Sequence, residues 1–449
     1  MAALSSGAPI VPVFIHDETL ETLGAAPRWR FGQGLETFAQ TLEGMGSKLI
    51  LRRGTALDCL TALAQETGAT SVHWQRAYDP ASIERDTAVK AALKAKGLNV
   101  ESHAGHLLFE PWTVQTKVGG FFKVYTPMWK SVKDRPIAES LCAPTALPSP
   151  SQWPKSDALA DWNMGVGMKR GADIVAQHAR VGENAAHQRL NAFVSGPIAA
   201  YRDDRNLPWK PGTSRLSENL AYGEISPRTC WHAGMCALQM GKDDAEVFLK
   251  ELVWREFAYH LIYHTPHILT DNWRSEWEAF PWQTDETDKV TAWKQGRTGI
   301  PFVDAAMREM YVTGTMHNRG RMIVASYLTK HLMTHWKIGM KWFEECLIDW
   351  DPASNAMGWQ WAAGSGPDAA PYFRVFNPVT QLDKFDPDHL YKNAWIAEGL
   401  SNPTDTALSY FKAVPKSWQL DPNTAYPTPI VTAEAGRKRA LEAYGSRGF

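Results

Sequence analysis

The stretch "DPASNAMGWQWAAGSGPDAAPYFRVFNP" at residues 351–378 combines small, backbone-shaping residues with two large aromatic side chains. Gly, Pro, Ala, Asn and Asp dominate the segment, a composition typical of loops, where backbone geometry matters more than core packing. Trp359 and Trp361 nevertheless stand in it with only Gln360 between them. We expect a loop whose backbone directs the two indole rings toward different partners.

The composition of the chain describes a folded protein without a strong overall charge. Its 449 residues are enough for two or three domains, and 44% hydrophobic residues support a genuine core. The formal charge of −1 excludes a general attraction to nucleic acid, so any basic surface must be local. The 20 tryptophans outnumber the 17 phenylalanines and the 13 tyrosines. Such a number raises the question of aromatic stacking or electron transfer.

Cysteine usage and hydropathy indicate the cellular compartment in which the protein is expected. The five cysteines form no CxxC pair and their number is odd, which argues against a disulfide framework, a zinc ribbon and a cysteine-ligated iron–sulfur cluster. No apolar run approaches the length of a membrane span, and the N-terminus lacks a signal-peptide pattern. We expect a cytoplasmic protein with no membrane partner, and a monomer.

The first hundred or so residues alternate short apolar runs with segments of helical spacing. Buried strands are predicted at "PIVPVFIHD" (9–17), "SKLILRRG" (48–55), "TSVHWQRAY" (70–78) and "KGLNVESH" (96–103). This alternation indicates an α/β domain with a parallel, Rossmann-like sheet covered by helices.

The remainder of the chain has a different organisation. A segment rich in Pro and Ser follows the α/β pattern, and nearly every segment after about residue 180 is predicted as helix. Ser226 as N-cap and Pro227 at the first helical position are an example of the helix signals. We predict an α/β domain at 1–120, a linker at 121–180 and an all-α domain at 181–449.

The segment "PGTSRLSENLAYGEISPR" (211–228) places Thr213, Ser214 and Ser217 at the start of a predicted helix. A helix N-terminus offers unpaired N–H groups and the positive end of a dipole, which suit a phosphate. An ordinary serine N-cap explains the same residues, and spacing alone favours that explanation.

The segment "KELVWREFAYHLIYH" (250–264) places Glu251 and Trp254 on one helix face. A carboxylate beside an indole can hydrogen-bond the edge of a planar ligand while the ring stacks on its face. The alternative is an ion pair between Glu251 and Arg255 with Trp254 in the core, which spacing alone favours.

The segment "TGTMHNRGRMIVASYLTKHLMTHW" (313–336) carries Asn318 as the predicted N-cap of a helix with Arg319 and Arg321. The arginines can hold phosphates or pair with the acidic "DWD" at 349–351. His331 and His335 are four residues apart, but no carboxylate completes a zincin arrangement, and no metal site is predicted.

Taken together, "TSRLS", "ELVWREF", "MHNRGRM" and "GWQWAAGSGPDAAPYFRVFNP", in this order and at these intervals, resemble the photolyase/cryptochrome family. The resemblance extends from residue 9 to about residue 400. It implies an N-terminal α/β antenna domain, a linker, and an all-α C-terminal domain that holds FAD folded back on itself. Members of the family either repair ultraviolet-damaged DNA with light or act as light receptors without repair.

Several positions are similar to those of a DNA photolyase for cyclobutane pyrimidine dimers, a carbon–carbon lyase. The family's lesion-pocket residues match Glu251, Trp254, Asn318 and Trp361, which become the implied catalytic residues. Asn355 matches the asparagine that faces flavin N5, where plant cryptochromes carry aspartate. The histidine pair that photolyases for (6-4) lesions carry around "MHNRGRM" is absent, and DASH-type cryptochromes usually replace the tryptophan at position 254.

The implied function is light-driven dimer repair, in which excited reduced FAD transfers an electron to a dimer flipped out of damaged DNA. The alternative is a cryptochrome-type blue-light photoreceptor that binds FAD without repair. A non-catalytic helical binder of nucleic acid is a third hypothesis, which a colourless purified protein would favour.

The resemblance also assigns binding residues. Its implied FAD contacts are Tyr201, Thr213, Ser214, Arg215, Leu216, Ser217, Arg321, Asp349, Asp351 and Asn355, with Arg321 and Asp349 as an ion pair. The implied electron relay consists of Trp359 next to the flavin, with Trp336 and Trp282 as outer members toward the surface. The implied DNA contacts are Arg205, Arg319, Arg374 and Gln381, and phosphate contacts of this kind make binding salt-dependent.

Two further features concern the sheet of the α/β domain and its second chromophore. The family's opening strand and loop, of the type "WFRRDLR", has no counterpart in this chain, so we expect a sheet that lacks this inner strand. Glu101 aligns loosely with a folate-contacting glutamate of some members. A second, antenna chromophore is therefore possible, and folate, deazaflavin, flavin or none all remain open.

Overall fold

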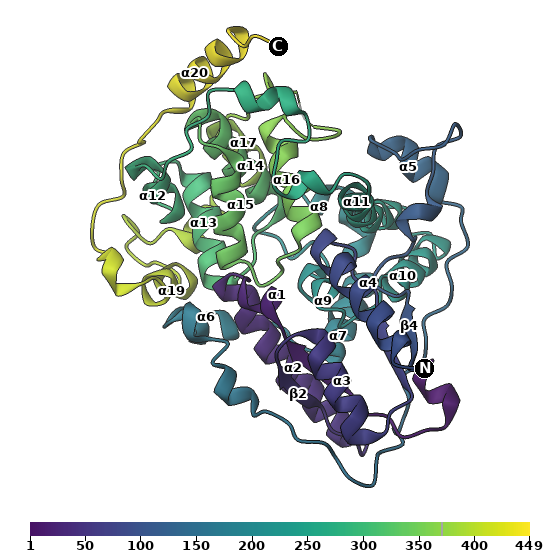
Figure 1. Ribbon diagram of the computed structural model, residues 1–449. Coiled ribbons are helices and arrows are strands. Elements are labelled where there is room, and N and C mark those ends of the chain that lie inside the picture. Colours follow the sequence, from purple (N-terminus) through teal and green to yellow (C-terminus); the bar gives the residue numbers. More distant parts are fainter. Residues whose placement is uncertain (370) are drawn as a thin grey trace.

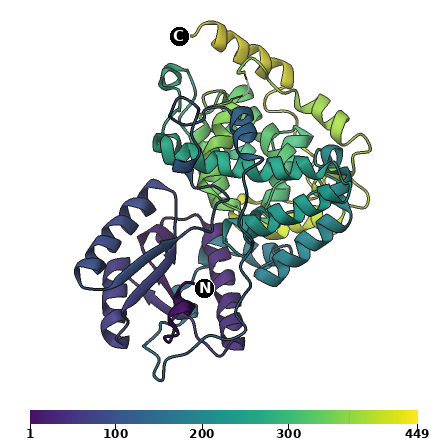
Figure 2. The ribbon, with the colours of Figure 1, turned by 90° about the vertical axis from the view of Figure 1, so that its right-hand side faces the viewer.

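The computed structural model describes residues 1–369 and 371–449, which form an α/β part and a larger helical part (Figures 1 and 2). Figure 2 shows the α/β part at lower left and the helical part above and to the right. The C-terminal helix lies at the end of the helical part that is far from the sheet (Figure 2). No helix in the described ranges is both long and apolar enough to cross a bilayer.

The α/β part contains the four predicted strands. They are β1 (Val13–His16), β2 (Ile50–Arg53), β3 (Ser71–Gln75) and β4 (Asn99–His103). β1 pairs with β2 and β3 pairs with β4, both in parallel. The predicted parallel pairing is present, and within the described residues no backbone ladder joins the two pairs, so they form two small parallel sheets.

Helices connect and cover these strands. Their bounds are α1 (Glu18–Glu21), α2 (Ala25–Gly44), α3 (Ala56–Thr67) and α4 (Pro80–Ala95). Thr55 and Asp79 cap α3 and α4 by accepting hydrogen bonds from backbone N–H groups of the first turn. A separate helix, α5 (Tyr125–Val132), precedes the segment 133–158, which has no helix or strand.

The helical part confirms the all-α prediction for the C-terminal region. Its helices are α6 (Gly171–Ala176), α7 (Glu183–Ser195), α8 (Tyr201–Asp204), α9 (Ser217–Ala221), α10 (Pro227–Gln239), α11 (Ala245–His264), α12 (Asp288–Lys294), α13 (Pro301–Thr313), α14 (Asn318–Ser326), α15 (Trp336–Cys346), α16 (Pro352–Ala363), α17 (Pro378–Phe385), α18 (Leu390–Trp395), α19 (Asp405–Ala413) and α20 (Ala433–Gly445). Ser226 caps α10 as predicted, with its hydroxyl accepting from Arg228 N at 3.2 Å.

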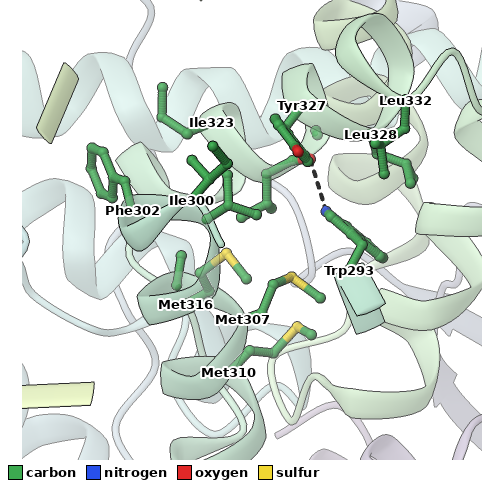
Figure 3. Packing of buried hydrophobic residues seen from close by; sticks show 14 of the residues in the cluster. Trp293, Ile300, Phe302, Met307, Met310, Met316, Ile323, Tyr327, Leu328 and Leu332 are labelled. Atoms are coloured by element: carbon green, nitrogen blue, oxygen red, sulfur yellow. Dashed lines mark hydrogen bonds between the residues drawn. The ribbon is translucent and has the colours of Figure 1, made fainter. Parts of the chain in front are cut away.

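The core of the helical part is built around α13, whose side chains are almost all buried. Met307 and Met310 of α13 lie beside Met316 and Trp293 in this core (Figure 3). The indole Nε1 of Trp293 donates to the carbonyl of Val324 at 3.2 Å, so the buried polar atom is satisfied. Flexible methionines fill irregular gaps between the larger rings.

The loop prediction for the tryptophan-bearing stretch is wrong, because residues 352–363 form the helix α16. Asp351 is its N-cap and accepts from Ser354 N, and Pro352 occupies the first turn. Gly364 ends the helix with a φ of 89°. The small residues alone suggested a loop. The segment is nevertheless a helix, because it has these start and stop signals and two alanines in its last turn.

The predicted N-cap of α14 is also displaced by one residue. The cap is His317, whose ring Nδ1 accepts from Arg319 N at 3.1 Å, and Asn318 is the first helical residue. The side chain of Asn318 is therefore exposed and available to a ligand.

A fully buried ion pair ties α13 to the segment after α18. The side chains of Arg308 and Glu398 are both 0% exposed, and their atoms lie 2.6 and 2.9 Å apart. Burial acts to raise the pKa of Glu398, but the hydrogen bonds and charge of Arg308 outweigh it and lower the pKa. Removing one partner of such a pair leaves a buried charge without compensation.

We expect Arg308→Met to lower the free energy of unfolding by about 3–5 kcal/mol, measured by chemical denaturation. The control Arg52→Met, in the half-exposed pair with Glu66, should cost at most about 1 kcal/mol. Because the folded-state pKa of Glu398 is lowered, the pair stabilises the wild type above the pKa of the unfolded carboxyl. That contribution is lost as the pH falls through the lower folded-state pKa. Equal losses in both variants would contradict this account.

Candidate cofactor and substrate site

One large cavity, of about 1040 Å³, opens between α7, α8, α9, α11, α14 and α16. Most residues predicted for the site line it: Tyr201, Arg205, Thr213, Ser214, Arg215, Leu216, Ser217, Glu251, Trp254, Asn318, Arg321, Asp349, Asp351, Asn355, Trp359 and Trp361. The remaining predicted residues do not line it: Trp282, Trp336, Arg319, Arg374 and Gln381.

Glu251 in the cavity wall pairs with Arg205 at 2.7 Å and not with Arg255. The alternative ion pair considered from sequence is therefore wrong, since Arg255 lies against Glu256 and His106. Burial raises the pKa of the Glu251 carboxyl, and the charge of Arg205 opposes this shift. The ion pair holds a carboxylate at the cavity wall in a fixed direction.

Trp254 is supported from behind by an aromatic side chain of α5. The rings of Tyr125 and Trp254 are stacked with 3.8 Å between centroids and 5° between planes. The Tyr125 hydroxyl donates to the carbonyl of Lys250 at 2.7 Å, and the Tyr125 N–H donates to Asp368 at 3.0 Å. The half-buried indole that lines the cavity is thus held in orientation by a residue far away in sequence.

Trp359 and Trp361 occupy different sides of α16 because residues two apart on a helix point in divergent directions. Trp359 is buried at 2% exposure and lies against Phe343 with 4.9 Å between ring centroids. It lies so close to α15 that a Cβ at Gly339 would be 2.1 Å from its ring. Trp361 is half-buried, and both rings line the cavity.

Charged and amide side chains from α14, α16 and the segment between α15 and α16 also line the cavity. Arg321 donates to both oxygens of Asp349, at 2.7 and 2.9 Å, as the resemblance implies. Asp351, the N-cap of α16, also accepts from the hydroxyl of Tyr259. The amide nitrogen of Asn355 reaches only the carbonyl of Met340, at 3.4 Å, so this amide remains available to a ligand.

The segment before α9 contributes hydroxyl groups and a strained backbone. Thr213, Ser214 and Ser217 line the cavity together with Arg215, whose φ is 52°. The Ser214 hydroxyl accepts from Leu216 N at 3.4 Å. These groups lie next to one another at the start of α9, where the resemblance implies FAD contacts.

A buried network fixes the position of α9. Arg30 of α2 lies 2.7 Å from Glu218 and 2.7 Å from Glu224, and its side chain is fully buried. Arg189 adds a second pair with Glu218 at 2.8 Å. Burial acts to lower the pKa of Arg30, but the two carboxylates outweigh it and raise that pKa. The α/β part therefore holds the segment before α9 in place through a charged contact.

Two buried nitrogen atoms of cavity residues have no hydrogen-bond partner among the described residues. They are His317 Nε2 and Trp359 Nε1. Burial, with the neighbouring charge of Arg319, lowers the pKa of His317 to about 4. The imidazole is thus neutral near pH 7. Unpaired buried nitrogens in a cavity wall point to a polar ligand that completes their hydrogen bonding.

The residues predicted for an electron relay are all buried. Trp282 and Trp336 flank the His335 ring, with centroids 5.3 and 5.4 Å from it. The indole of Trp282 donates to Thr329 O at 2.9 Å and that of Trp336 to Asn272 at 2.8 Å. Trp282 is only 7% exposed, so the structure does not place it at the surface as expected for an outer member.

The predicted DNA contacts have separate environments. Arg319 lies over the Phe385 ring at 4.3 Å and donates to Asn206. Arg374 is exposed, and Gln381 is half-buried on α17. Arg205 is engaged by Glu251 in the cavity, as described above. Arg319 lies near Arg205, whereas Arg374 and Gln381 belong to other elements and do not line the cavity.

Three residues in or near the site were not singled out from the sequence. His317 lines the cavity, Tyr125 of the predicted linker stacks on Trp254, and Lys330 lies outside the cavity wall. Lys330 is fully buried, burial lowers its pKa to about 7, and its Nζ donates to the carbonyl of Arg374 at 3.2 Å. An apolar surrounding sequence was the available signal for Lys330, whereas Tyr125 offered none.

Comparisons with known proteins show the family to which the chain belongs. Residues 248–446 match the family model of the FAD binding domain of DNA photolyase, and residues 1–151 match that of DNA photolyase. The chain is 42% identical to a deoxyribodipyrimidine photo-lyase of Agrobacterium fabrum, over 99% of this chain and 94% of that one. It is 33% identical to cryptochrome-2 of Arabidopsis thaliana, over 99% of this chain and 76% of the relative.

A solved structure extends this similarity to three dimensions. A class III photolyase from Agrobacterium tumefaciens superimposes with a TM-score of 0.91 at 41% identity, covering 99% of this chain and 93% of that one. The chain therefore belongs to the photolyase/cryptochrome family. The predictions of the family, of the α/β plus all-α fold class and of FAD as cofactor are confirmed.

The residues of the cavity fit FAD. A volume of about 1040 Å³ lies at the upper end of the range for small-molecule sites and suits a large dinucleotide. The hydroxyls before α9 and the cationic Arg215 suit a pyrophosphate, and the unpaired His317 Nε2 and Trp359 Nε1 suit polar atoms of a ring system. No residue of the wall carries an unpaired acidic cluster that would repel an anionic cofactor.

We expect Gly339→Ala to cost about 1–3 kcal/mol, because the added methyl overlaps the Trp359 ring and forces it to move. The control is Gly44→Ala in α2, which does not line the cavity and where nothing lies within 4 Å of the added Cβ. This control should be neutral or stabilise by up to about 1 kcal/mol. Denaturation curves and the FAD content after purification measure the two effects. Unchanged stability and FAD content in Gly339→Ala would contradict the packing of Trp359 on α15.

Proposed function

We propose that this protein repairs cyclobutane pyrimidine dimers in damaged DNA under light, as a cytoplasmic monomer. The observation that carries the proposal is that Trp254 and Trp361 line one cavity together with Glu251 and Asn318. Two indoles with a carboxylate and an amide between helices suit a pair of planar bases whose edges need hydrogen bonds. The predicted bounds 1–120, 121–180 and 181–449 are retained as the proposed domains.

The residues that would hold FAD are those of the segment before α9, with Tyr201, Arg321, Asp349, Asp351 and Asn355. FAD held there in its reduced form would supply the light-excitable one-electron donor that splitting of the dimer needs. Arg321 is neutralised by Asp349, so the wall carries no net charge there. Asn355 presents a neutral amide, which can hydrogen-bond a ligand without donating a proton from a carboxylic acid.

The lesion-pocket residues act by orienting the dimer. Trp254 is fixed by the stacked Tyr125, and Glu251 is fixed by Arg205. Fixed groups of this kind need no reorganisation when the charge of the dimer changes, which is the source of electrostatic preorganisation. Base stacking on aromatic rings tolerates any sequence around the lesion.

DNA binding is proposed to rest on phosphate contacts and on flipping. Arg205, Arg319, Arg374 and Gln381 would position the strands without reading base edges, and a damaged base costs less to unstack. The buried ammonium of Lys330 holds the backbone of Arg374 and so places this side chain.

The decisive experiment illuminates reduced holoprotein with an oligonucleotide that contains a thymine dimer and follows the return of thymine absorbance. Trp254→Ala should weaken dimer binding by about 1–3 kcal/mol, the worth of one aromatic stack, and should lower repair accordingly. The control Trp112→Ala removes a ring that is 41% exposed and does not line the cavity, and repair should persist. Wild-type behaviour of Trp254→Ala would contradict the pocket.

The same experiment separates the proposal from the alternative function. The chain shares 33% identity with cryptochrome-2 of Arabidopsis thaliana, so a receptor role has support within the family. Bound, reduced FAD without any return of thymine absorbance would favour the photoreceptor. A protein that purifies without FAD would exclude both light-driven functions.

We expect Trp336→Phe to slow the photoreduction of oxidised FAD strongly, because phenylalanine is much harder to oxidise than indole. Repair by enzyme reduced beforehand should remain nearly intact, since the cavity does not include position 336. The absorbance of FAD during illumination measures the rate of photoreduction. The return of thymine absorbance measures the rate of repair. Equal loss of both activities would refute the relay role and indicate a structural role for this buried ring.

A further inference from the structure

One face of the β3–β4 sheet is polar, a pattern that dimer repair leaves unexplained. Val72, Trp74 and Val100 pack on the other face against residues of α3 and α4. Parallel strands are usually buried on both faces and therefore apolar on both. Here the second face carries His73, Glu101 and His103, none of which is buried.

The register of the two strands brings these three side chains together. His73 of β3 is the direct partner of Glu101 of β4, and His103 follows two residues later on the same face. His73 Nδ1 and His103 Nε2 are 3.1 Å apart, and the two rings are stacked with 5.3 Å between centroids. One potential ligand atom of each residue lies within 4.8 Å of the others.

We propose that His73, Glu101 and His103 bind a divalent transition-metal ion of the Zn²⁺ type, with water completing the coordination. Two imidazole nitrogens and one carboxylate oxygen are a ligand set that Zn²⁺, Co²⁺ and Ni²⁺ accept. Nitrogens about 2.1 Å from one ion are about 3.1 Å apart when the angle at the ion is near 95°. The observed separation of the ring nitrogens therefore needs little adjustment.

The surroundings leave the ligand atoms available. Glu101 accepts one hydrogen bond at Oε1, from Asn99 at 3.1 Å, so Oε2 can bind a metal. The two histidine nitrogens face each other, and without a metal one of them must carry the proton between them. The bound ion would connect β3 with β4 across the exposed face, where no hydrophobic cluster stabilises the small sheet. Binding of the ion to the folded state alone would raise its stability.

The test uses the full-length holoprotein after removal of metals with a chelator. Titration with Zn²⁺ in a calorimeter should give one equivalent for the wild type, and Co²⁺ should give visible absorption bands of a low-symmetry site. Both signals should disappear in His73→Ala and in His103→Ala. The midpoint of thermal unfolding should rise with Zn²⁺ in the wild type and stay constant in these variants.

The matched control is His187→Ala, which removes a half-exposed histidine that lies 3.8 Å from Glu183 on α7 without a third ligand. This variant should still bind one equivalent. Circular dichroism and FAD content verify that all variants are folded, and Glu101→Gln, which keeps the size of the side chain, should bind more weakly. No saturable Zn²⁺ binding to folded wild type, or one equivalent that survives His73→Ala and His103→Ala, would overturn the proposal.

Discussion

The buried charge of Arg30 is the constraint that joins the two parts of the molecule. A guanidinium that is fully buried needs a neutralising partner. Glu218 and Glu224 each form an ion pair with it at 2.7 Å. Glu218 lies in α9 and Glu224 follows it, so the segment that lines the cavity depends on a side chain of α2 (Figure 1). The start of α2 also contacts α15: a Cβ at Gly24 would lie 2.2 Å from the carbonyl oxygen of Glu344. One helix of the α/β part thus braces both the cofactor segment and the helix that carries Trp336.

The placement of the two neighbouring tryptophans follows from a helix rather than from a flexible loop. On α16 a separation of two residues directs Trp359 into the contact with Gly339 and Phe343, while Trp361 remains half-buried at the cavity. A rigid helix fixes the relation between the two rings, because neither can rotate about the backbone independently. Under the proposed function, the geometry of the lesion wall at Trp361 and that of the Trp359 ring beside FAD would therefore be coupled through one element.

Local sequence signals predicted most local structure correctly. They gave a wrong prediction where the composition suggested a loop but the capping residues specified a helix. The four strands and the Ser226 cap follow from short patterns, but the small residues of 352–363 masked the Asp351 cap and the Gly364 stop. Most residues of the cavity were predicted from their match to family motifs and not from their spacing in the sequence. Contacts between distant segments, such as Tyr125 on Trp254, were not predictable, because no local pattern encodes them. The arrangement of the strands in two pairs likewise depends on contacts between segments that are distant in the sequence.

The lesion wall shows how a cavity keeps polar and aromatic groups in fixed directions. Glu251 is buried enough that its pKa rises, which by itself would favour the neutral acid, yet Arg205 at 2.7 Å opposes that shift. Arg319, near Arg205, has its pKa lowered by burial and by that like charge, and it rests on the Phe385 ring. A DNA phosphate near the two arginines would relieve their repulsion, whereas Glu251 would gain a base edge as a further partner. Under the proposed function, Arg205 would link strand binding with lesion binding, because it pairs with Glu251 and lies near Arg319.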